Sequence, residues 1–354
     1  MRYDPIVENK RTPVHLPPTE TAGLDDDTPR SMSIGARLRS PQTIISFIVA
    51  VVIIALVFRQ LNINFFDVWR QVRNANPLYL GVAFVAYYGS FPVRAARWRL
   101  LLRNASISRT AGHHIPNIQG LSEIYLLSWF VNCLVPAKLG DAYRGYLLKK
   151  HAGPSFSRTL GTIFAERLLD VVALVLLMVV SGLFVFQGTV PDSLRWWFAA
   201  GGGLVVVGVG GLIALITANH HIQKIVPHRF RDYYVKLTEG VVTSFSRTGF
   251  VMVATYTIMI WALEGVRVYF AARAIGVDLS ATSSVFVALL ASLLTTFPLT
   301  PAGLGVVEGG TVLALQLFDV EKAQAAAVAL VDRGIASYSV ILIGGLLYFV
   351  TKRK

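Results

Sequence analysis

One five-residue phrase occurs twice in this chain, and each copy ends an apolar stretch. The letters PAKLG at residues 136–140 return 165 residues later as PAGLG at residues 301–305. An acid–arginine pair follows each copy, Glu166-Arg167 in the first case and Asp332-Arg333 in the second, 166 residues apart. Two matches at nearly the same offset indicate an internal duplication, so we expect a fold built from two related halves.

Composition places both halves in a membrane. Hydrophobic residues make up 54% of the chain and charged residues 15%, and apolar runs near the ~20 residues that cross a bilayer recur along it. We therefore predict an all-α, polytopic integral membrane protein. The full spans are expected at 42–58, 78–96, 159–186, 196–218, 250–275 and 325–350.

Two further apolar stretches, 121–135 and 281–297, end at the repeated phrase and are followed by return arms at 137–150 and 302–318. Closely spaced Pro and Gly make one uninterrupted helix unfavourable there. We predict that each pair of arms forms a re-entrant-type hairpin, 121–150 and 281–318, which returns to its side of entry. The predicted turn residues are Pro136, Gly140, Pro301, Gly303 and Gly305.

The return helices are predicted to begin at Pro136 and Pro301, with Thr300 as the N-cap of the second. Helix N-termini placed there would direct N–H groups and a positive dipole end towards an anion such as phosphate. The glycines of the turns fit close helix packing as well as ligand contact, because small residues commonly line helix contacts in lipid.

The basic residues predict the orientation. Residues 97–118, 138–158, 219–249 and the C-terminal tail hold most of the Lys and Arg outside the spans. By the positive-inside rule these segments lie in the cytoplasm, as do both termini. Residues 1–41 are rich in Pro and balanced in charge, so we expect a disordered cytoplasmic tail there. The net charge of +13 therefore belongs to the membrane-associated part.

This topology predicts two membrane repeats, at 42–186 and 196–350, each with three spans and one hairpin. The second repeat starts from the opposite side of the membrane, so its elements run inverted relative to the first. Inverted repeats place a binding site near the middle of the membrane, between the halves, and permit alternating access.

Ionisable residues within the apolar segments form the candidate site. An unpaired charge at mid-bilayer costs at least ~2.5–3.5 kcal/mol, so these side chains should face the bundle interior and pair with one another. Structural ion pairing and substrate contact both remain open for Glu166 and Asp332, whereas headgroup contact is favoured for Arg167 and Arg333. The candidate substrate-binding residues are Arg97, Asp141, Arg144, Glu166, Arg167, Asp170, Glu308, Asp332 and Arg333.

Further polar residues stand near the predicted span ends. Arg94, Arg97, Trp98 and Arg99 lie close to a membrane boundary, where snorkelling and positive-inside anchoring are favoured over ligand contact. Glu264 and Arg267, three residues apart, extend the polar set.

No motif predicts catalytic residues, a cofactor, a metal centre or nucleic-acid binding. The sequence contains no P-loop or dinucleotide-binding fingerprint, and Cys133 is its only cysteine, so no internal disulfide can form. The two His-His pairs, at 113–114 and 220–221, lack metal-site spacing and are expected at the membrane interface. The sequence leaves the oligomeric state open.

Several motifs, in this order, resemble one known family. They are Arg97-Trp98 after the second span, the 136–144 segment with its Pro, Gly, Asp and Arg, the segment ERLLD at 166–170, the segment PAGLGVVE at 301–308, and the late Arg333. Together they are similar to the transmembrane region of lysylphosphatidylglycerol synthases. In the bifunctional members of that family, this region is implicated in moving an aminoacylated phospholipid between leaflets, while a soluble domain attaches the amino acid.

The resemblance implies lipid handling in the cytoplasmic membrane of a bacterium or archaeon, by a stand-alone member without the soluble domain. The resulting hypothesis is a flippase or transporter that moves a phospholipid or lipid-linked headgroup between leaflets. Its partners would be membrane lipids with phosphate-bearing headgroups. A membrane-embedded lipid-modifying enzyme and a non-transporting partner of an envelope-lipid pathway remain alternatives.

Overall fold

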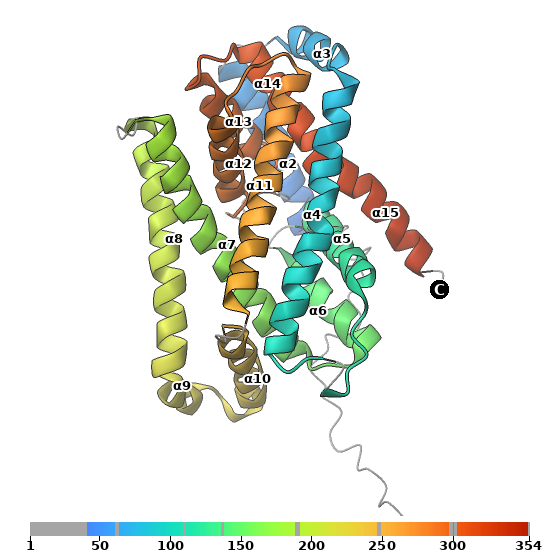
Figure 1. Ribbon diagram of the computed structural model, residues 1–354, viewed down its shortest axis with the longest axis vertical. Coiled ribbons are helices and arrows are strands. Elements are labelled where there is room, and N and C mark those ends of the chain that lie inside the picture. The colour runs from blue at the N-terminus through green and yellow to red at the C-terminus, as the bar shows by residue number, and fades with distance from the viewer. Residues whose placement is uncertain are drawn as a thin grey trace, which may run out of the picture.

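The computed structural model describes residues 41–60, 64–108, 111–135, 138–187, 192–245, 249–296, 300 and 303–352. These residues form helices joined by loops, and no strand occurs among them (Figure 1). The prediction of an all-α polytopic membrane protein is confirmed. The predicted tail before Pro41 and the predicted turn residues Pro136 and Pro301 lie outside the described residues.

The predicted spans all lie in helices. Among the described residues, four helical segments are long and apolar enough to cross a membrane, at 156–185, 198–215, 250–274 and 322–351. The other two predicted spans form the 20-residue α2 and the 28-residue α4, which carries four arginines in its second half. The helices are α2 (Pro41–Gln60), α3 (Phe65–Arg73), α4 (Pro77–Asn104), α5 (Ile118–Leu134), α6 (Leu139–Ala152), α7 (Phe156–Val185), α8 (Asp192–Thr217), α9 (Asn219–Ile225), α10 (His228–Ser244), α11 (Phe250–Ala274), α12 (Ala281–Thr296), α13 (Val306–Gln316), α14 (Lys322–Arg333), η3 (Gly334–Tyr338) and α15 (Ser339–Lys352).

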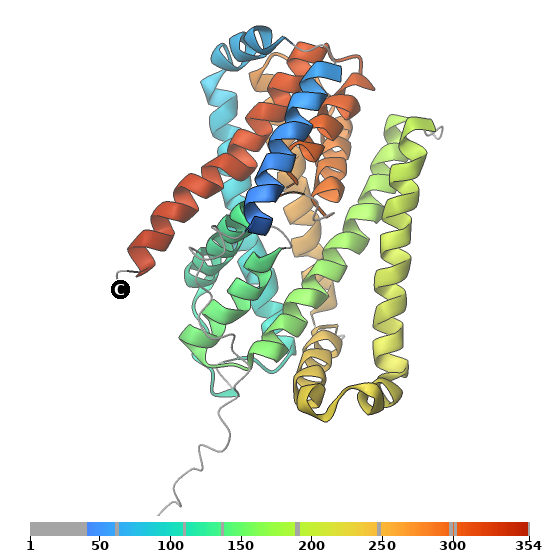
Figure 2. The same cartoon turned by 180° about the vertical axis from the view of Figure 1, so that it is seen from behind.

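Two long helices, α4 and α11, pack antiparallel along the middle of the molecule (Figures 1 and 2). Each of them also packs on the first helix of the following hairpin, α5 after α4 and α12 after α11. In Figure 1 the α5–α6 hairpin occupies the lower half of the molecule and the α12–α13 hairpin the upper half. The two hairpins therefore enter from opposite ends of the molecule.

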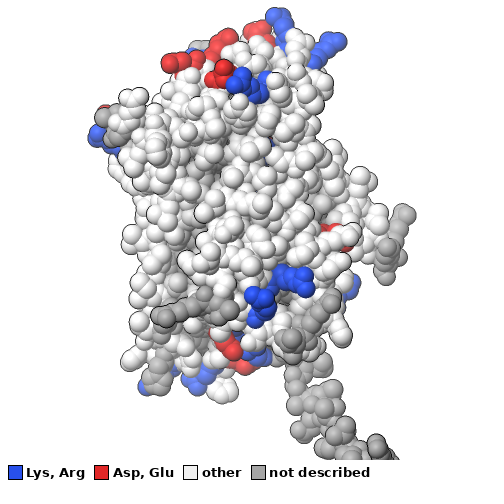
Figure 3. Space-filling model, viewed as in Figure 1, with Lys and Arg blue, Asp and Glu red and all other residues white. Residues whose placement is uncertain are grey.

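The surface consists of an apolar belt between two charged ends. Figure 3 shows most Lys, Arg, Asp and Glu side chains gathered at the top and bottom, with a broad face of other residues between them. Large apolar side chains are exposed on this belt, among them Val85 of α4, Leu176 of α7 and Leu342 of α15. Such a surface suits contact with lipid chains.

The sequence did not predict the short helices α3, α9 and α10. In Figure 1, α3 lies across the upper end and α9 and α10 lie at the lower end; α3 packs on α14, and α10 packs along α7. Two glycines allow the close approach of α10 to α7. A Cβ atom on Gly161 would lie 2.3 Å from the carbonyl oxygen of Leu237, and one on Gly240 would lie 2.3 Å from that of Arg158.

Both return helices begin later than predicted. The first begins at Leu139, three residues after Pro136, and the second begins at Val306. The late start of α13 has a conformational reason, because Gly303 and Gly305 have φ angles of +72° and +85°. Those angles lie outside the right-handed helical region, and glycine adopts them without a Cβ clash.

The prediction that Thr300 caps the second return helix is wrong. Its hydroxyl donates a hydrogen bond to the carbonyl oxygen of Leu304, so it stabilises the turn instead. The N-cap is Gly305, whose N–H donates to the Glu308 carboxylate at 2.6 Å. Glu308 thus satisfies a helix N-terminus that would otherwise lack a partner inside the membrane.

The last predicted span is one long helix with a change of pitch. α14, the π-helical segment η3 and α15 follow one another without a break from Lys322 to Lys352. The π segment begins at Gly334, immediately after Asp332-Arg333. π segments inside α-helices are rare and often occur at functional sites.

Candidate functional site

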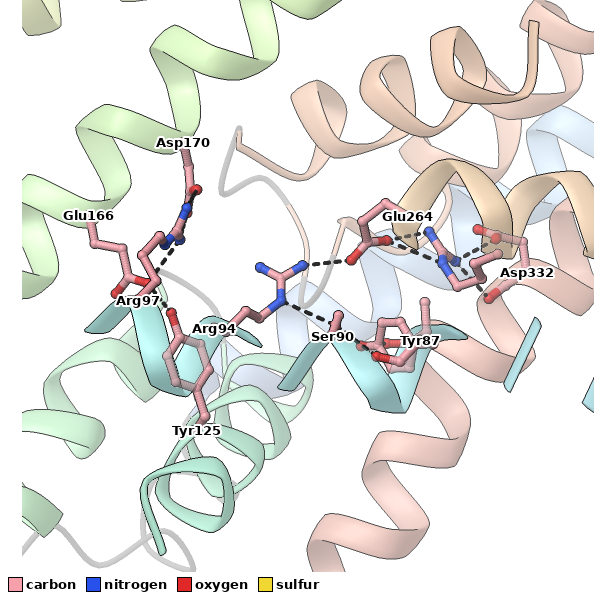
Figure 4. Close-up of polar contacts among 11 residues, drawn as sticks. Tyr87, Ser90, Arg94, Arg97, Tyr125, Glu166, Asp170, Glu264 and Asp332 are labelled. Atoms are coloured by element: carbon pink, nitrogen blue, oxygen red, sulfur yellow. Dashed lines mark hydrogen bonds and ion pairs between the residues drawn. The ribbon is translucent and has the colours of Figure 1, made fainter. Parts of the chain in front are cut away.

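The first cluster of buried charges surrounds Glu166 of α7, whose side chain is 1% exposed (Figure 4). Arg97 of α4 donates to one Glu166 oxygen at 2.9 Å and to Asp170, one turn further along α7, at 2.6 Å. Arg144 of α6 donates to the other Glu166 oxygen at 2.8 Å, and the Tyr125 hydroxyl also donates to Glu166. Four elements, α4, α5, α6 and α7, therefore meet at one carboxylate.

Aromatic rings support this cluster. The Arg144 guanidinium lies over the rings of Trp98 and Tyr125, 4.7 and 4.2 Å from their centroids. Trp98 is fully buried and donates its indole N–H to Thr162 of α7. Cation–π contacts of this kind are strongest where water is excluded.

The neighbouring Arg167 binds the first hairpin. Its guanidinium donates two hydrogen bonds, of 2.7 and 2.8 Å, to Asp141 near the start of α6. Asn132 of α5 accepts from the Gly140 N–H at 2.8 Å and donates to Asp141 at 3.4 Å. Gly140 also packs against α5 so closely that a Cβ atom would lie 1.9 Å from the carbonyl oxygen of Ser128. Close helix packing is therefore the role of Gly140 that the geometry supports.

The second cluster surrounds Glu264 of α11 and lies to the right of the first in Figure 4. Arg94 of α4 donates to Glu264 at 2.6 Å, and Arg267 of α11 does so at 2.9 Å. Arg267 also donates to Asp332 of α14, while Arg333 donates to Glu308 of α13 at 3.1 Å. All of these side chains are less than one-tenth exposed.

The same two pairings recur in each half of the chain. An arginine of the long central helix binds the acid of the acid–arginine pair, and the arginine of that pair binds an acid on the return helix of the hairpin. The pairs are Arg97–Glu166 and Arg167–Asp141 in the first half, and Arg267–Asp332 and Arg333–Glu308 in the second. This correspondence lends support to the predicted repeats.

A cavity of about 170 Å³ lies between the two clusters. Both hairpin turns contribute to its wall, the first through Val135 and Lys138 and the second through Thr300 and Gly303. The charged side chains on its wall are Arg94, Lys138, Arg167, Asp170, Glu264, Arg267, Asp332 and Arg333. The arrangement can hold a polar group within a shell of apolar helices, which is the property that a headgroup site needs.

The structure brings the nine candidate site residues into these two clusters. Each of the nine takes part in an ion pair, as expected for charges in lipid. Asp141 and Arg144, three residues apart, do not pair with each other but with two residues of α7. Whether any of the nine contacts a substrate stays a prediction.

The expectation of boundary anchoring is wrong for Arg94, Arg97 and Trp98. Their exposed fractions are 6%, 0% and 0%, so all three belong to the interior. Arg99, on another face of α4, is exposed. The basic residues of α4 therefore lie on different faces of the helix, although they are close together in the sequence.

Sequence reasoning missed Tyr125, Trp129, Asn132, Lys138 and Trp261 as parts of the site. A signal existed for Lys138, because it is the one residue that differs between the two copies of the repeated phrase. Among the described residues, no group of three or more His, Cys, Asp and Glu side chains is arranged to hold a metal ion.

Comparison with known proteins identifies the family. The model of the lysylphosphatidylglycerol synthase TM region matches residues 43–344. The chain belongs to this family. It is 34% identical over 229 residues to a UPF0104 membrane protein of Methanocaldococcus jannaschii, a match that covers 64% of this chain and 95% of that protein.

Two further relatives are covered by the match to different extents. A UPF0104 membrane protein of Methanothermobacter thermautotrophicus is 26% identical, with 84% of this chain and 93% of that protein covered. The protein named glycosyltransferase AglD of Haloferax volcanii is 28% identical, with 89% of this chain but 55% of that protein covered. No solved structure gives a significant match.

Proposed function

We propose that this protein moves a phosphate-bearing lipid headgroup between the two leaflets of the membrane. The observation that carries the proposal is the charged cavity whose wall includes the turns of both hairpins. Because the hairpins enter from opposite ends of the molecule, a headgroup in the cavity lies between two structures that can open to different sides (Figure 1).

The ion pairs supply a mechanism for coupling headgroup binding to hairpin movement. Arg167 and Arg333 lie on the cavity wall, and each is bound to an acid near the start of a return helix. A phosphate that binds Arg167 competes with Asp141 for the same guanidinium. The carboxylate is planar and the phosphate is tetrahedral, but each can accept two hydrogen bonds from one guanidinium. Binding would weaken the tie between α7 and the first hairpin, and so favour a different arrangement of that hairpin.

The same competition at Arg333 would release Glu308. Glu308 also accepts from the Gly305 N–H, so its release changes the cap of α13 as well as an ion pair. A headgroup passing from Arg167 to Arg333 would then loosen the two hairpins in turn. Alternating access follows if only one hairpin is loosened at a time.

Reconstitution tests the proposal. Purified protein in vesicles that contain a fluorescent phospholipid should expose inner-leaflet lipid to a membrane-impermeant quencher, whereas protein-free vesicles should not. Arg333→Ala should keep the protein folded and abolish this movement if the residue contacts the headgroup.

A double variant separates that role from a structural one. If Arg333 only pairs with Glu308, the single variant loses stability and activity together, and Arg333→Ala combined with Glu308→Gln recovers much of both, because removing both charges is less costly than leaving one buried and the Gln amide oxygen can still accept from the Gly305 N–H. Joint recovery in the double variant would contradict the headgroup role. Absence of lipid movement in the unmodified protein would contradict the proposed function.

The name of one relative supports a second candidate, a lipid-modifying enzyme. The match covers 55% of that glycosyltransferase, so we keep glycosyl transfer only as an alternative function for this chain. Mass spectrometry of the lipids recovered from the same vesicles distinguishes the two. A flippase leaves the mass of its lipid unchanged, whereas a transferase that is supplied with a sugar donor increases it.

A further inference from the structure

Lys138 stands at a backbone position that favours glycine. Its φ angle is +53°, in the left-handed region that non-glycine residues rarely adopt. The residue at the same place in the second copy of the phrase is Gly303, with φ of +72°. Both hairpin turns therefore have a positive φ angle at this position, and only the first places a long side chain there. Unfavourable backbone conformations of this kind tend to occur at functional sites.

The Lys138 side chain lines the cavity. It makes no hydrogen bond or ion pair with any of the residues that the structure describes, whereas the arginines around the cavity are paired. Its electrostatic neighbours are Arg167, which repels it, and Asp141 and Asp170, which are already bound to arginines.

The charge balance shows what Lys138 adds. The cluster around Glu264 contains three basic and three acidic side chains, Arg94, Arg267, Arg333, Glu264, Glu308 and Asp332. The cluster around Glu166 contains four basic and three acidic ones, Arg97, Lys138, Arg144, Arg167, Asp141, Glu166 and Asp170. With Lys138 charged, the two clusters together therefore have an excess of one positive charge, and the excess lies at the first hairpin.

Two indole groups add donors without adding charge. Trp129 of α5 and Trp261 of α11 both line the cavity, and neither indole N–H has a hydrogen-bond partner among the residues that the structure describes. Trp261 is 8% exposed, so water at the surface does not satisfy it. A buried donor without an acceptor is costly, and a ligand with acceptor oxygens would remove that cost.

We propose that Lys138 is the anchor for a phosphate ester with one net negative charge, and that it selects such molecules over zwitterionic ones. This inference rests on the proposed headgroup site and narrows its substrate class. A phosphodiester without an amine balances the single excess charge. A headgroup that also carries an ammonium group restores the excess positive charge, and a dianionic phosphate leaves the two clusters with an excess of one negative charge.

Thermal unfolding of the purified protein in detergent tests the assignment. The probes are dihexanoyl phosphatidylglycerol, dihexanoyl phosphatidylcholine and glycerol 3-phosphate, each titrated against the unmodified protein and three variants. Lys138→Gln removes the charge, and Lys138→Gly removes the charge together with the unfavourable backbone conformation. Lys150→Gln, which changes an exposed lysine at the far end of α6, is the matched control.

We expect phosphatidylglycerol to raise the Tm of the unmodified protein and of the Lys150 variant, and phosphatidylcholine to have little effect. Both Lys138 variants should need at least about tenfold more phosphatidylglycerol for the same shift, since a charge-assisted contact is lost. Without ligand, Lys138→Gly should have a higher Tm than Lys138→Gln, because glycine accepts the left-handed conformation. If Lys138 had only a structural role, both Lys138 variants would have a lower Tm than the unmodified protein, and phosphatidylglycerol would raise their Tm as much as it raises that of the unmodified protein.

Several outcomes would overturn the assignment. Equal stabilisation by the two lipids, or an unchanged response in both Lys138 variants, contradicts it. Stabilisation by glycerol 3-phosphate that equals that of phosphatidylglycerol contradicts the selection for a single negative charge, because a phosphate monoester carries close to two negative charges at neutral pH.

The vesicle assay separates this inference from the proposed function. Lys138-dependent binding without lipid movement would contradict transport and leave the anion site standing. Equal movement of both lipids, unchanged in Lys138→Gln, would support transport and contradict the selectivity.

Discussion

Replacing Glu166 by Gln should destabilise the protein more than any exposed substitution, because one carboxylate holds the first cluster together. Arg144 is fully buried, and Glu166, at 2.8 Å, is the acid to which it binds. Its remaining nitrogens, Nε and Nη1, have no hydrogen-bond partner in the described part of the chain. A neutral amide at position 166 leaves the Arg144 charge buried without a counter-ion. Removal of one partner from a buried pair costs about 3–5 kcal/mol.

Arg97 limits the loss of stability in this variant, because it still pairs with a second acid. Asp170 lies 2.6 Å from its guanidinium, so the Arg97–Asp170 pair remains neutral in the Glu166→Gln variant. The unbalanced charge is therefore that of Arg144. Adding Arg144→Met should restore the balance and recover more than half of the lost stability. Recovery should be incomplete, because the cation–π contacts of Arg144 with Trp98 and Tyr125, about 1–2 kcal/mol, are also removed.

Thermal unfolding of the two single variants and the double variant in detergent measures this coupling. At about 2 °C per kcal/mol for a chain of this size, Glu166→Gln should lower the Tm by roughly 6–10 °C. The double variant should lie above Glu166→Gln by at least roughly 3 °C. A double variant whose loss equals the sum of the two single losses would refute the argument, since it would show that the two side chains stabilise the protein independently.

Two further predictions concern packing and topology. Gly161→Ala should destabilise the protein by about 1–3 kcal/mol, because its Cβ would meet the backbone of α10, whereas Gly202→Ala on α8, with no atom within 4 Å of its Cβ, should be neutral or slightly stabilising in the same unfolding assay. In a protein with Cys133 replaced by Ala, cysteines at Lys150 and Glu321 should react with a membrane-impermeant reagent from opposite sides, Lys150 from the cytoplasm; labelling of both from one side would contradict the predicted topology.

The sequence was sufficient to predict the long apolar helices, the hairpins and the presence of ion pairs. Each of these follows from a rule that acts locally or on one residue at a time: apolar length, Pro and Gly interruptions, and the cost of a lone charge in lipid. Glu166, Asp332 and their arginines were predicted to pair for that reason, and they do.

The choice of partners could not be predicted in the same way. Asp141 and Arg144 lie within reach of each other on α6. Asp141 nevertheless pairs with Arg167 of α7, and Arg144 pairs with Glu166 of α7, because α6 packs against α7. The burial of Arg97 likewise depends on how α4 packs against α7 and α11, which no local pattern of residues determines. Even the left-handed turn at Lys138 is visible in the sequence only after alignment of the two phrases.

The π segment at 334–338 gives the last helix an unusual mechanical property. Conversion of this segment to ordinary α-helical pitch would change the register of α15 relative to α14 by about one residue, which corresponds to a rotation of about 100° and a shift of about 1.5 Å. α15 packs on α5 so closely that a Cβ on Gly344 would lie 2.6 Å from the Phe130 side chain. A rotation of α15 that begins beside Arg333, in the second half of the chain, would therefore move α5 and with it the first hairpin.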